Sequence, residues 1–141
     1  MLDGYCSDLT RCFVFDRIPG DWYMDVYETV RVAQAAAVAA VSAGVSCRDV
    51  DAAARRRITD AGHGENFGHG TGHGVGLEVH ESPRLNTIST ASLETGMVVT
   101  VEPGVYIPGL GGVRIEDLLV VAPSGCEVLT GLPKELRILQ P

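Results

Sequence analysis

Two glutamates lie inside apolar, strand-like runs and are the first residues in the sequence to indicate chemistry. Glu102 ends a run of valines, and Glu116 interrupts a second run of branched residues. A carboxylate in such a run is costly unless a cation or several hydrogen bonds satisfy it. A hairpin centred on Gly109 places the two side chains opposite each other, with Cβ atoms about 5 Å apart. Two like charges at that distance repel unless a divalent cation lies between them. The pattern therefore favours a cation site over a pair of solvated edge glutamates.

Histidines form the second group of residues that could do chemistry. Their segment is rich in glycine, which disfavours a helix and allows close backbone approach. A single histidine is more often an ordinary core or surface residue, but this clustering favours at least one metal ligand or proton carrier. The segment matches neither the helical HExxH zinc motif nor the GxGxxG nucleotide motif. The four histidines are His63, His69, His73 and His80.

The elements that must position these residues follow an order of strand, two helices and several strands. Residues 5–15 are rich in β-branched and aromatic residues, which predicts a strand with Asp8 and Thr10 on one face. Apolar residues at three- and four-residue steps predict a helix over 22–42, and Ser46 is a candidate N-cap for a second helix that ends at Gly62. In that second helix, Ala53 is expected to face inward and residues 55–57 to be mostly solvated. Further strands are expected over 97–107, 112–121 and 127–129. The order predicts an α+β fold in which an antiparallel sheet has helices on one face.

Composition limits the classes of function. The 141 residues suit one domain over 1–141, and the formal net charge of −7 disfavours nucleic acid as a partner. No apolar run is long enough for a membrane helix, and the N-terminus lacks the features of a signal peptide, so we expect a cytoplasmic protein without a membrane partner. The four scattered cysteines are expected to be reduced thiols.

Five motifs in order resemble one family, the pita-bread metallopeptidases, which holds methionine aminopeptidases, Xaa-Pro aminopeptidases and prolidases. The resemblance implies the C-terminal portion of the pita-bread (creatinase/aminopeptidase) fold, with a curved antiparallel sheet. The last motif and the loop around Gly109 are similar to the Xaa-Pro peptidases rather than to the methionine enzymes. The motifs are GYCSDLTR (4–11), HGTGHGVGL (69–77), VHESP (79–83), VEPGVY (101–106) and VRIED (113–117).

The resemblance also implies a site. Asp8 and Glu116 would bridge two divalent ions, and His73 and Glu102 would serve one of them. Glu102 would in addition move the proton of the attacking water, while His80, His69 and Arg114 would line the substrate pocket. The oxygen-rich ligands with one imidazole suit manganese first, with cobalt, zinc or iron as alternatives. The implied activity is hydrolysis of the bond before proline in short Xaa-Pro peptides by metal-activated water.

One family feature has no counterpart in the sequence. The family places another aspartate, a ligand of the second ion alone, eleven positions before the residue that matches Asp8, which falls before Met1. We therefore expect the chain to be the C-terminal part of a catalytic domain, holding one or two ions. The alternatives are an inactive metal- or peptide-binding fragment of the same fold and a misassigned start codon. A homodimer is left open.

Overall fold

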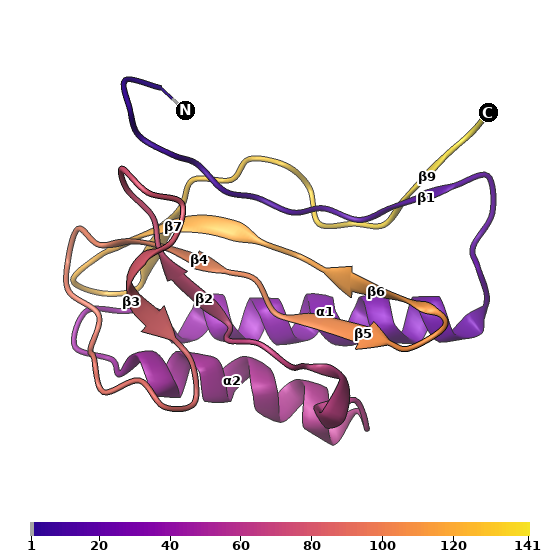
Figure 1. Ribbon diagram of the computed structural model, residues 1–141, viewed down its shortest axis with the longest axis horizontal. Helices are drawn as coiled ribbons and strands as arrows, with labels where there is room; N and C mark the ends of the chain where they lie inside the picture. The colour runs from indigo at the N-terminus through magenta and orange to yellow at the C-terminus, as the bar shows by residue number, and fades with distance from the viewer. Residues whose placement is uncertain (1) are drawn as a thin grey trace.

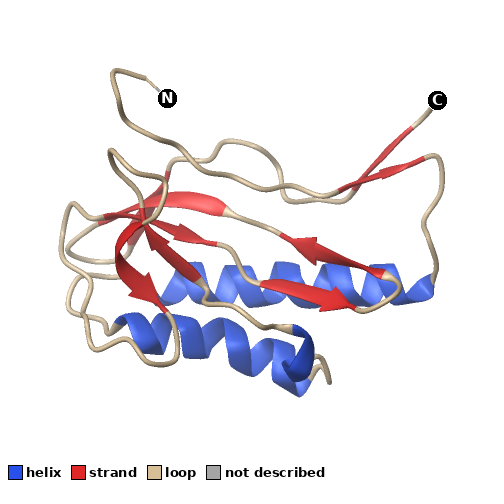
Figure 2. Ribbon diagram, in the orientation of Figure 1, coloured by secondary structure: helices blue, strands red, loops and turns tan. Residues whose placement is uncertain are grey.

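The computed structural model describes residues 2–141, and its elements form three layers (Figure 1, Figure 2). Two helices lie side by side against one face of a central sheet, and the N- and C-terminal segments run along the other side. The helices are α1 (Asp21–Ala40) and α2 (Cys47–Asp60), followed by the 3-10 turn η1 (Gly64–Asn66). The strands are β1 (Phe13–Phe15), β2 (Gly72–Gly74), β3 (Glu81–Leu85), β4 (Val98–Val101), β5 (Gly104–Ile107), β6 (Gly111–Arg114), β7 (Asp117–Val121), β8 (Cys126–Val128) and β9 (Arg137–Leu139).

The central sheet has five antiparallel strands in the order β3-β2-β4-β7-β8, and the β5–β6 hairpin extends two of them. Val101 pairs with Asp117, and Gly104 pairs with Arg114. Both pairs fit a hairpin centred on Gly109, so the predicted register is confirmed. The mixed fold with an antiparallel sheet and helices on one face is confirmed as well.

The two predicted long strands are broken at the glutamates, which was not predicted. Between the two ladders, the Glu102 N–H donates to the carbonyl of Thr71 at 2.7 Å, and the Glu116 N–H donates to the carbonyl of Thr10 at 3.1 Å. Each glutamate thus turns its backbone away from the other strand toward a different neighbour. The break brings the glycine-rich segment to one glutamate and the N-terminal segment to the other.

Helices α1 and α2 form because their apolar residues repeat with the helical period and bury one face. Val30, Ala33 and Ala37 of α1 are buried in one core with Ala54 and Ile58 of α2. Ser46 caps α2, since its hydroxyl accepts the N–H of Asp49 at 3.1 Å. Both helices match their predicted positions to within two residues at each end.

Four expectations about local structure need correction. The strand predicted over 5–15 is regular only in β1, which pairs in parallel with the C-terminal β9, a pairing of distant segments that no local pattern reveals. The strand β3 was missed because Pro83 lies inside it, and proline is rare within a strand. Ala53 is half-buried rather than inward-facing. Arg55 is not mostly solvated, because its guanidinium bonds to a buried carboxylate and two carbonyls.

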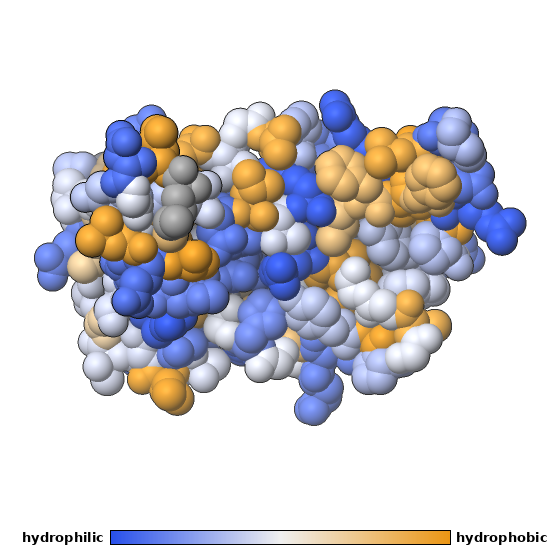
Figure 3. All heavy atoms as spheres, turned by 45° about the horizontal axis from the view of Figure 1, so that its top comes forward, coloured by the Kyte–Doolittle hydropathy of each residue, from blue (hydrophilic) through white to orange (hydrophobic). Residues whose placement is uncertain are grey.

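The face that carries the termini has a mixed surface (Figure 3). Apolar side chains gather over the β1–β9 end, where the exposed large ones are Phe13, Phe15, Ile138 and Leu139. Within residues 2–141, no helix combines the length and the apolar character required to cross a bilayer.

Candidate metal centre

Four side chains from four separate segments meet beside the break in the sheet. Asp8, His73 and Glu116 offer ligand atoms that all lie within 4.8 Å of one another. The His73 Nε2 atom lies 3.0 Å from Glu102 Oε1 and 3.9 Å from Asp8 Oδ2. The four residues expected to act as ligands are therefore brought together. They come from the N-terminal segment, β2, the end of β4 and the start of β7.

His73 reaches the cluster because glycines flank it. A Cβ atom at Gly72 would lie 1.9 Å from the carbonyl oxygen of Thr100, and one at Gly74 would lie 2.2 Å from that of Ser82. Only glycine lets β2 approach its neighbours this closely. The His73 Nδ1 atom lies 3.0 Å from the Gly74 carbonyl, which can only accept, so Nδ1 carries the proton and Nε2 faces the carboxylates.

Glu116 is the least satisfied group of the site. The residue is 2% exposed, and its Oε2 atom accepts the Thr10 hydroxyl at 2.6 Å. Its Oε1 atom is buried without a hydrogen-bond partner. Burial, together with the charges of Glu102 and Asp8, outweighs the Thr10 bond and raises the pKa of Glu116 to about 7. A buried acceptor of this kind needs an explanation, and a cation supplies one.

His73 and Glu102 each shift the pKa of the other toward its charged form. Burial alone would lower the pKa of His73, but the bonds to Glu102 and to the Gly74 carbonyl prevail and raise it. Burial alone would raise the pKa of Glu102, but His73 and the Thr100 hydroxyl prevail and lower it. The raised pKa of His73 shows that positive charge is favoured among these carboxylates.

The cluster fits a divalent cation. It combines three carboxylates with one imidazole, a ligand set that suits manganese, cobalt, iron or zinc. A divalent cation beside Glu116 would bind its unpaired oxygen and lower its raised pKa.

A cleft of about 360 Å³ opens beside the cluster. The His80 ring is exposed, and its centroid lies 4.4 Å from that of His73. The Arg114 Nε donates to the Thr10 hydroxyl at 3.0 Å and lies 4.0 Å from Glu102 Oε2. The three histidines expected at the site, His69, His73 and His80, therefore line the same cleft as Arg114. Its lining residues are His69, Gly70, Gly72, His73, His80, Arg84, Asn86, Glu102 and Arg114.

Several residues of the site were not singled out from the sequence. Thr10 holds Glu116, and its position on the same strand face as Asp8 was the available signal. The Tyr106 hydroxyl lies 3.0 Å from His69 Nε2 and 3.3 Å from an Arg114 nitrogen. Asn86 lines the cleft from the loop after β3, a strand that sequence patterns did not reveal.

A buried ion cluster, here called the Asp117 cluster, fixes the segments that carry two of the four residues. The Arg11 side chain donates to Asp117 at 2.7 Å and to the Glu116 carbonyl at 2.6 Å. Lys134 forms an ion pair with the same carboxylate, and Gln34 of α1 donates to it at 2.9 Å. The cluster therefore ties the N-terminal segment, β7, α1 and the C-terminal tail together next to Glu116.

Carboxylates and an imidazole that meet beside a cleft can hold a divalent cation next to a bound molecule. Comparison with known families identifies the class of protein: residues 1–123 match the model of metallopeptidase family M24, and the chain belongs to that family.

Named relatives agree with this assignment. An uncharacterized peptidase of Bacillus subtilis is 52% identical over 136 residues, which is 96% of this chain and 38% of the relative. The Xaa-Pro dipeptidase of Lactobacillus delbrueckii is 45% identical over 139 residues, covering 99% of this chain and 38% of the relative. The solved Xaa-Pro dipeptidase from Bacillus anthracis superposes with a TM-score of 0.94 at 53% identity, over 96% of this chain and 38% of that one. The expected pita-bread fold is thereby confirmed. The chain spans about 38% of the length of these relatives.

Proposed function

We propose that this chain carries the metal-binding part of an exopeptidase that cleaves the bond before proline in short Xaa-Pro peptides. The observation that carries the proposal is the convergence of Asp8, His73, Glu102 and Glu116 around a buried carboxylate oxygen that lacks a partner. Relatives named Xaa-Pro dipeptidase and prolidase, at 43–45% identity, support the substrate class.

The four clustered residues would hold the cation, manganese in the first instance. The family resemblance gives Asp8 and Glu116 the role of serving a second ion as well, which the two oxygens of each carboxylate allow. When bound, the metal would lower the pKa of a water molecule and polarise the scissile carbonyl. The remaining roles belong to the side chains of the cleft.

Glu102 is suited to accept and return a proton. Its side chain is 16% exposed at the cleft, and the lowered pKa keeps it ionised at neutral pH. His80 lies at the exposed rim, where its imidazole can donate to the substrate carbonyl oxygen. Arg114 and His69 line the same cleft and share the hydroxyl of Tyr106, so they would hold the peptide rather than move its protons.

The test is turnover by the purified chain loaded with Mn²⁺. We expect release of the N-terminal residue from an Ala-Pro peptide and none from a matched Ala-Ala peptide. Tight Mn²⁺ binding without turnover would overturn the catalytic proposal and favour the alternative, an inactive metal-binding fragment. Loss of both binding and turnover would refute the metal site itself.

The role of His80 is tested by substitution. His80→Ala should keep the Mn²⁺ affinity and lose most of the turnover, because the ring lies in the cleft but is not among the four clustered side chains. His63→Ala is the matched control, since His63, in the turn after α2, pairs with Asp25 of α1 and does not line the cleft. Parallel loss of metal and turnover in His80→Ala would contradict the assigned role.

A further inference from the structure

Arg55 and Asp51, on one face of α2, contact the segment that carries the site histidines His69 and His73. Asp51 is 1% exposed and pairs with Arg55, one helical turn later, through two hydrogen bonds of 2.8 and 3.0 Å. Neither residue lines the part of the cleft that borders the metal cluster. A pair with a buried carboxylate and two hydrogen bonds does more than cover the surface of a helix.

The guanidinium holds the backbone of the histidine segment. Arg55 donates to the carbonyl of Phe67 at 3.0 Å and to the carbonyl of His69 at 2.7 Å. It also stacks on the Phe67 ring, with its central carbon 4.2 Å from the ring centroid. The same ring packs edge-on against the His69 imidazole at 5.0 Å. The planar guanidinium of Arg55 thus holds the residues on both sides of Gly68.

The carboxylate holds the next part of the segment. The Asp51 Oδ1 atom accepts the Thr71 hydroxyl at 2.9 Å and shares the Thr71 N–H, at 3.1 Å, with the carbonyl of Leu85 at 2.8 Å. The Thr71 carbonyl in turn accepts the N–H of Glu102. A continuous chain of hydrogen bonds therefore runs from α2 to the backbone of a proposed ligand.

We propose that Arg55 and Asp51 are positioning residues, which fix the segment 67–71 so that His69 faces the cleft. The inference rests on the proposed function only for its catalytic consequence. His69 depends on the clamp because no strand pairing holds it, and its ring is oriented by the Gly70 carbonyl at 2.7 Å and the Tyr106 hydroxyl. His73 does not depend on it, since β2 pairs with β3 and β4 and the Thr100 hydroxyl accepts its N–H.

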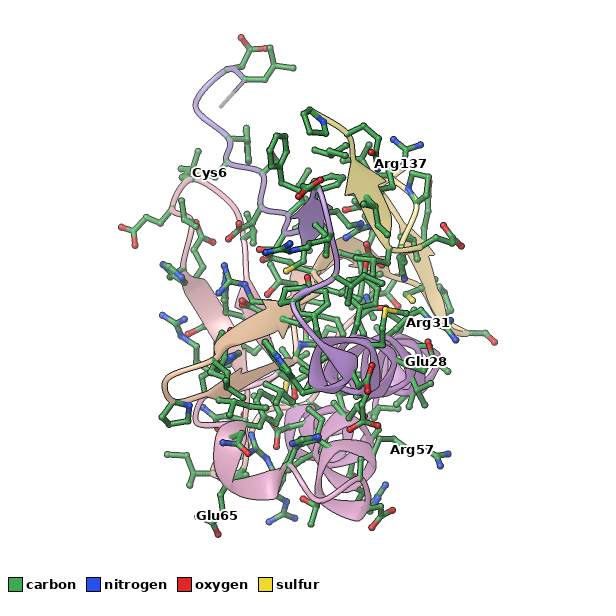
Figure 4. All side chains as sticks on the ribbon, turned by 90° about the vertical axis from the view of Figure 1, so that its right-hand side faces the viewer. Cys6, Glu28, Arg31, Arg57, Glu65 and Arg137 are labelled. Atoms are coloured by element: carbon green, nitrogen blue, oxygen red, sulfur yellow. The ribbon has the colours of Figure 1, made fainter. Side chains whose placement is uncertain are left out.

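The experiment compares Arg55→Lys with Arg57→Lys by nuclear magnetic resonance of the imidazole nitrogens in the full chain without metal. Lysine keeps the charge but loses the planar fork that spans a carboxylate and two carbonyls. Arg57 is the matched control because it is exposed on the same helix and points away from the body of the molecule (Figure 4).

We expect the wild-type His69 to carry its proton on Nδ1, facing the Gly70 carbonyl. In Arg55→Lys that signal should be lost or averaged between tautomers, while the His73 signals stay at their wild-type positions. Arg57→Lys should change neither. Unchanged His69 signals in Arg55→Lys, or equal changes at both histidines, would overturn the proposal.

A second variant guards against simple unfolding. If Arg55→Lys does not fold, Arg55→Gln is measured in the same way, because its amide can still donate to one carbonyl. Failure of both to fold would assign the pair a purely structural role and overturn the proposal.

The catalytic consequence is measured separately. With Mn²⁺ bound, kcat/KM for an Xaa-Pro peptide should fall on the order of tenfold or more in Arg55→Lys at unchanged Mn²⁺ affinity, because misplaced binding groups reduce turnover. If the wild-type chain binds no metal and cleaves nothing, the proposed function fails, and the imidazole spectra still decide whether the clamp positions His69.

Discussion

Replacing Glu116 with glutamine separates the stability of the fold from the capacity of the site to hold a cation. Without a cation, the Glu116 carboxyl is buried and one of its oxygens has no partner. Burial first, and then the charges of Glu102 and Asp8, raise its pKa from 4.5 to about 7. The ionised form is therefore less favourable in the folded chain than in the unfolded chain.

The magnitude follows from that shift. Because the folded pKa is raised, the carboxyl contributes stability that is fully present below about pH 4.5 and is lost as the pH rises through 7. At about 1.4 kcal/mol for each pKa unit, the loss approaches roughly 3 kcal/mol at pH 8. Glutamine does not titrate, so Glu116→Gln should gain roughly 2–3 kcal/mol over the wild type between pH 5 and pH 8.

The assay is urea unfolding at both pH values, without divalent cations and then with saturating Mn²⁺. The variant should be more stable than the wild type at pH 8 without metal. Mn²⁺ should stabilise it less, because a bound ligand adds RT ln(1 + [L]/Kd), which is smaller for a weaker site. Glu65→Gln, an exposed glutamate that points away from the molecule (Figure 4), should change neither quantity. A variant that is less stable than the wild type at pH 8 and responds equally to Mn²⁺ would refute the reasoning.

Three further predictions concern the sheet, the pH dependence and the buried ion cluster. Gly72→Ala should destabilise the chain by about 3 kcal/mol or more in thermal unfolding, since its Cβ would collide with a backbone carbonyl of β4, whereas Gly68→Ala, which has open space, should be tolerated. Mn²⁺ affinity measured by calorimetry should rise from pH 6 to pH 8, because the metal must displace protons from His73 and Glu116, whose pKa values are raised; a flat profile would contradict this. Asp117→Asn should destabilise the fold by about 3–5 kcal/mol in urea, since it leaves the buried guanidinium of Arg11 and the ammonium of Lys134 without their anion; a change below 1 kcal/mol would contradict the pairing.

The sequence carries enough information to predict the register at the site. The turn residues around Gly109 set the hairpin, and a hairpin has one register once its turn is fixed. The alternation of the N-terminal segment was also predictable, since Cys6, Asp8 and Thr10 are half-buried while Ser7 and Leu9 are exposed. Both patterns depend on residues that are close together in the sequence, and the fold retains them.

The parts that were missed depend on contacts between distant segments. The pairing of β1 with β9 joins segments near the two ends of the chain, and no periodicity in either segment predicts it. Arg55 lies in a run of three arginines that predicts a solvated face, and only the fold brings Phe67 and His69 to it. The break at Glu102 likewise arises because Thr71 competes for its backbone N–H.

The most direct test of the cation site is anomalous diffraction from crystals of this chain grown with Mn²⁺. The account predicts one strong peak with ligand atoms of Asp8, His73, Glu102 and Glu116 within about 2.3 Å. It also predicts that the contact between His73 Nε2 and Glu102 is replaced by a shared cation. A peak elsewhere, or no peak at saturating Mn²⁺ with the His73 and Glu102 pair intact, would contradict it.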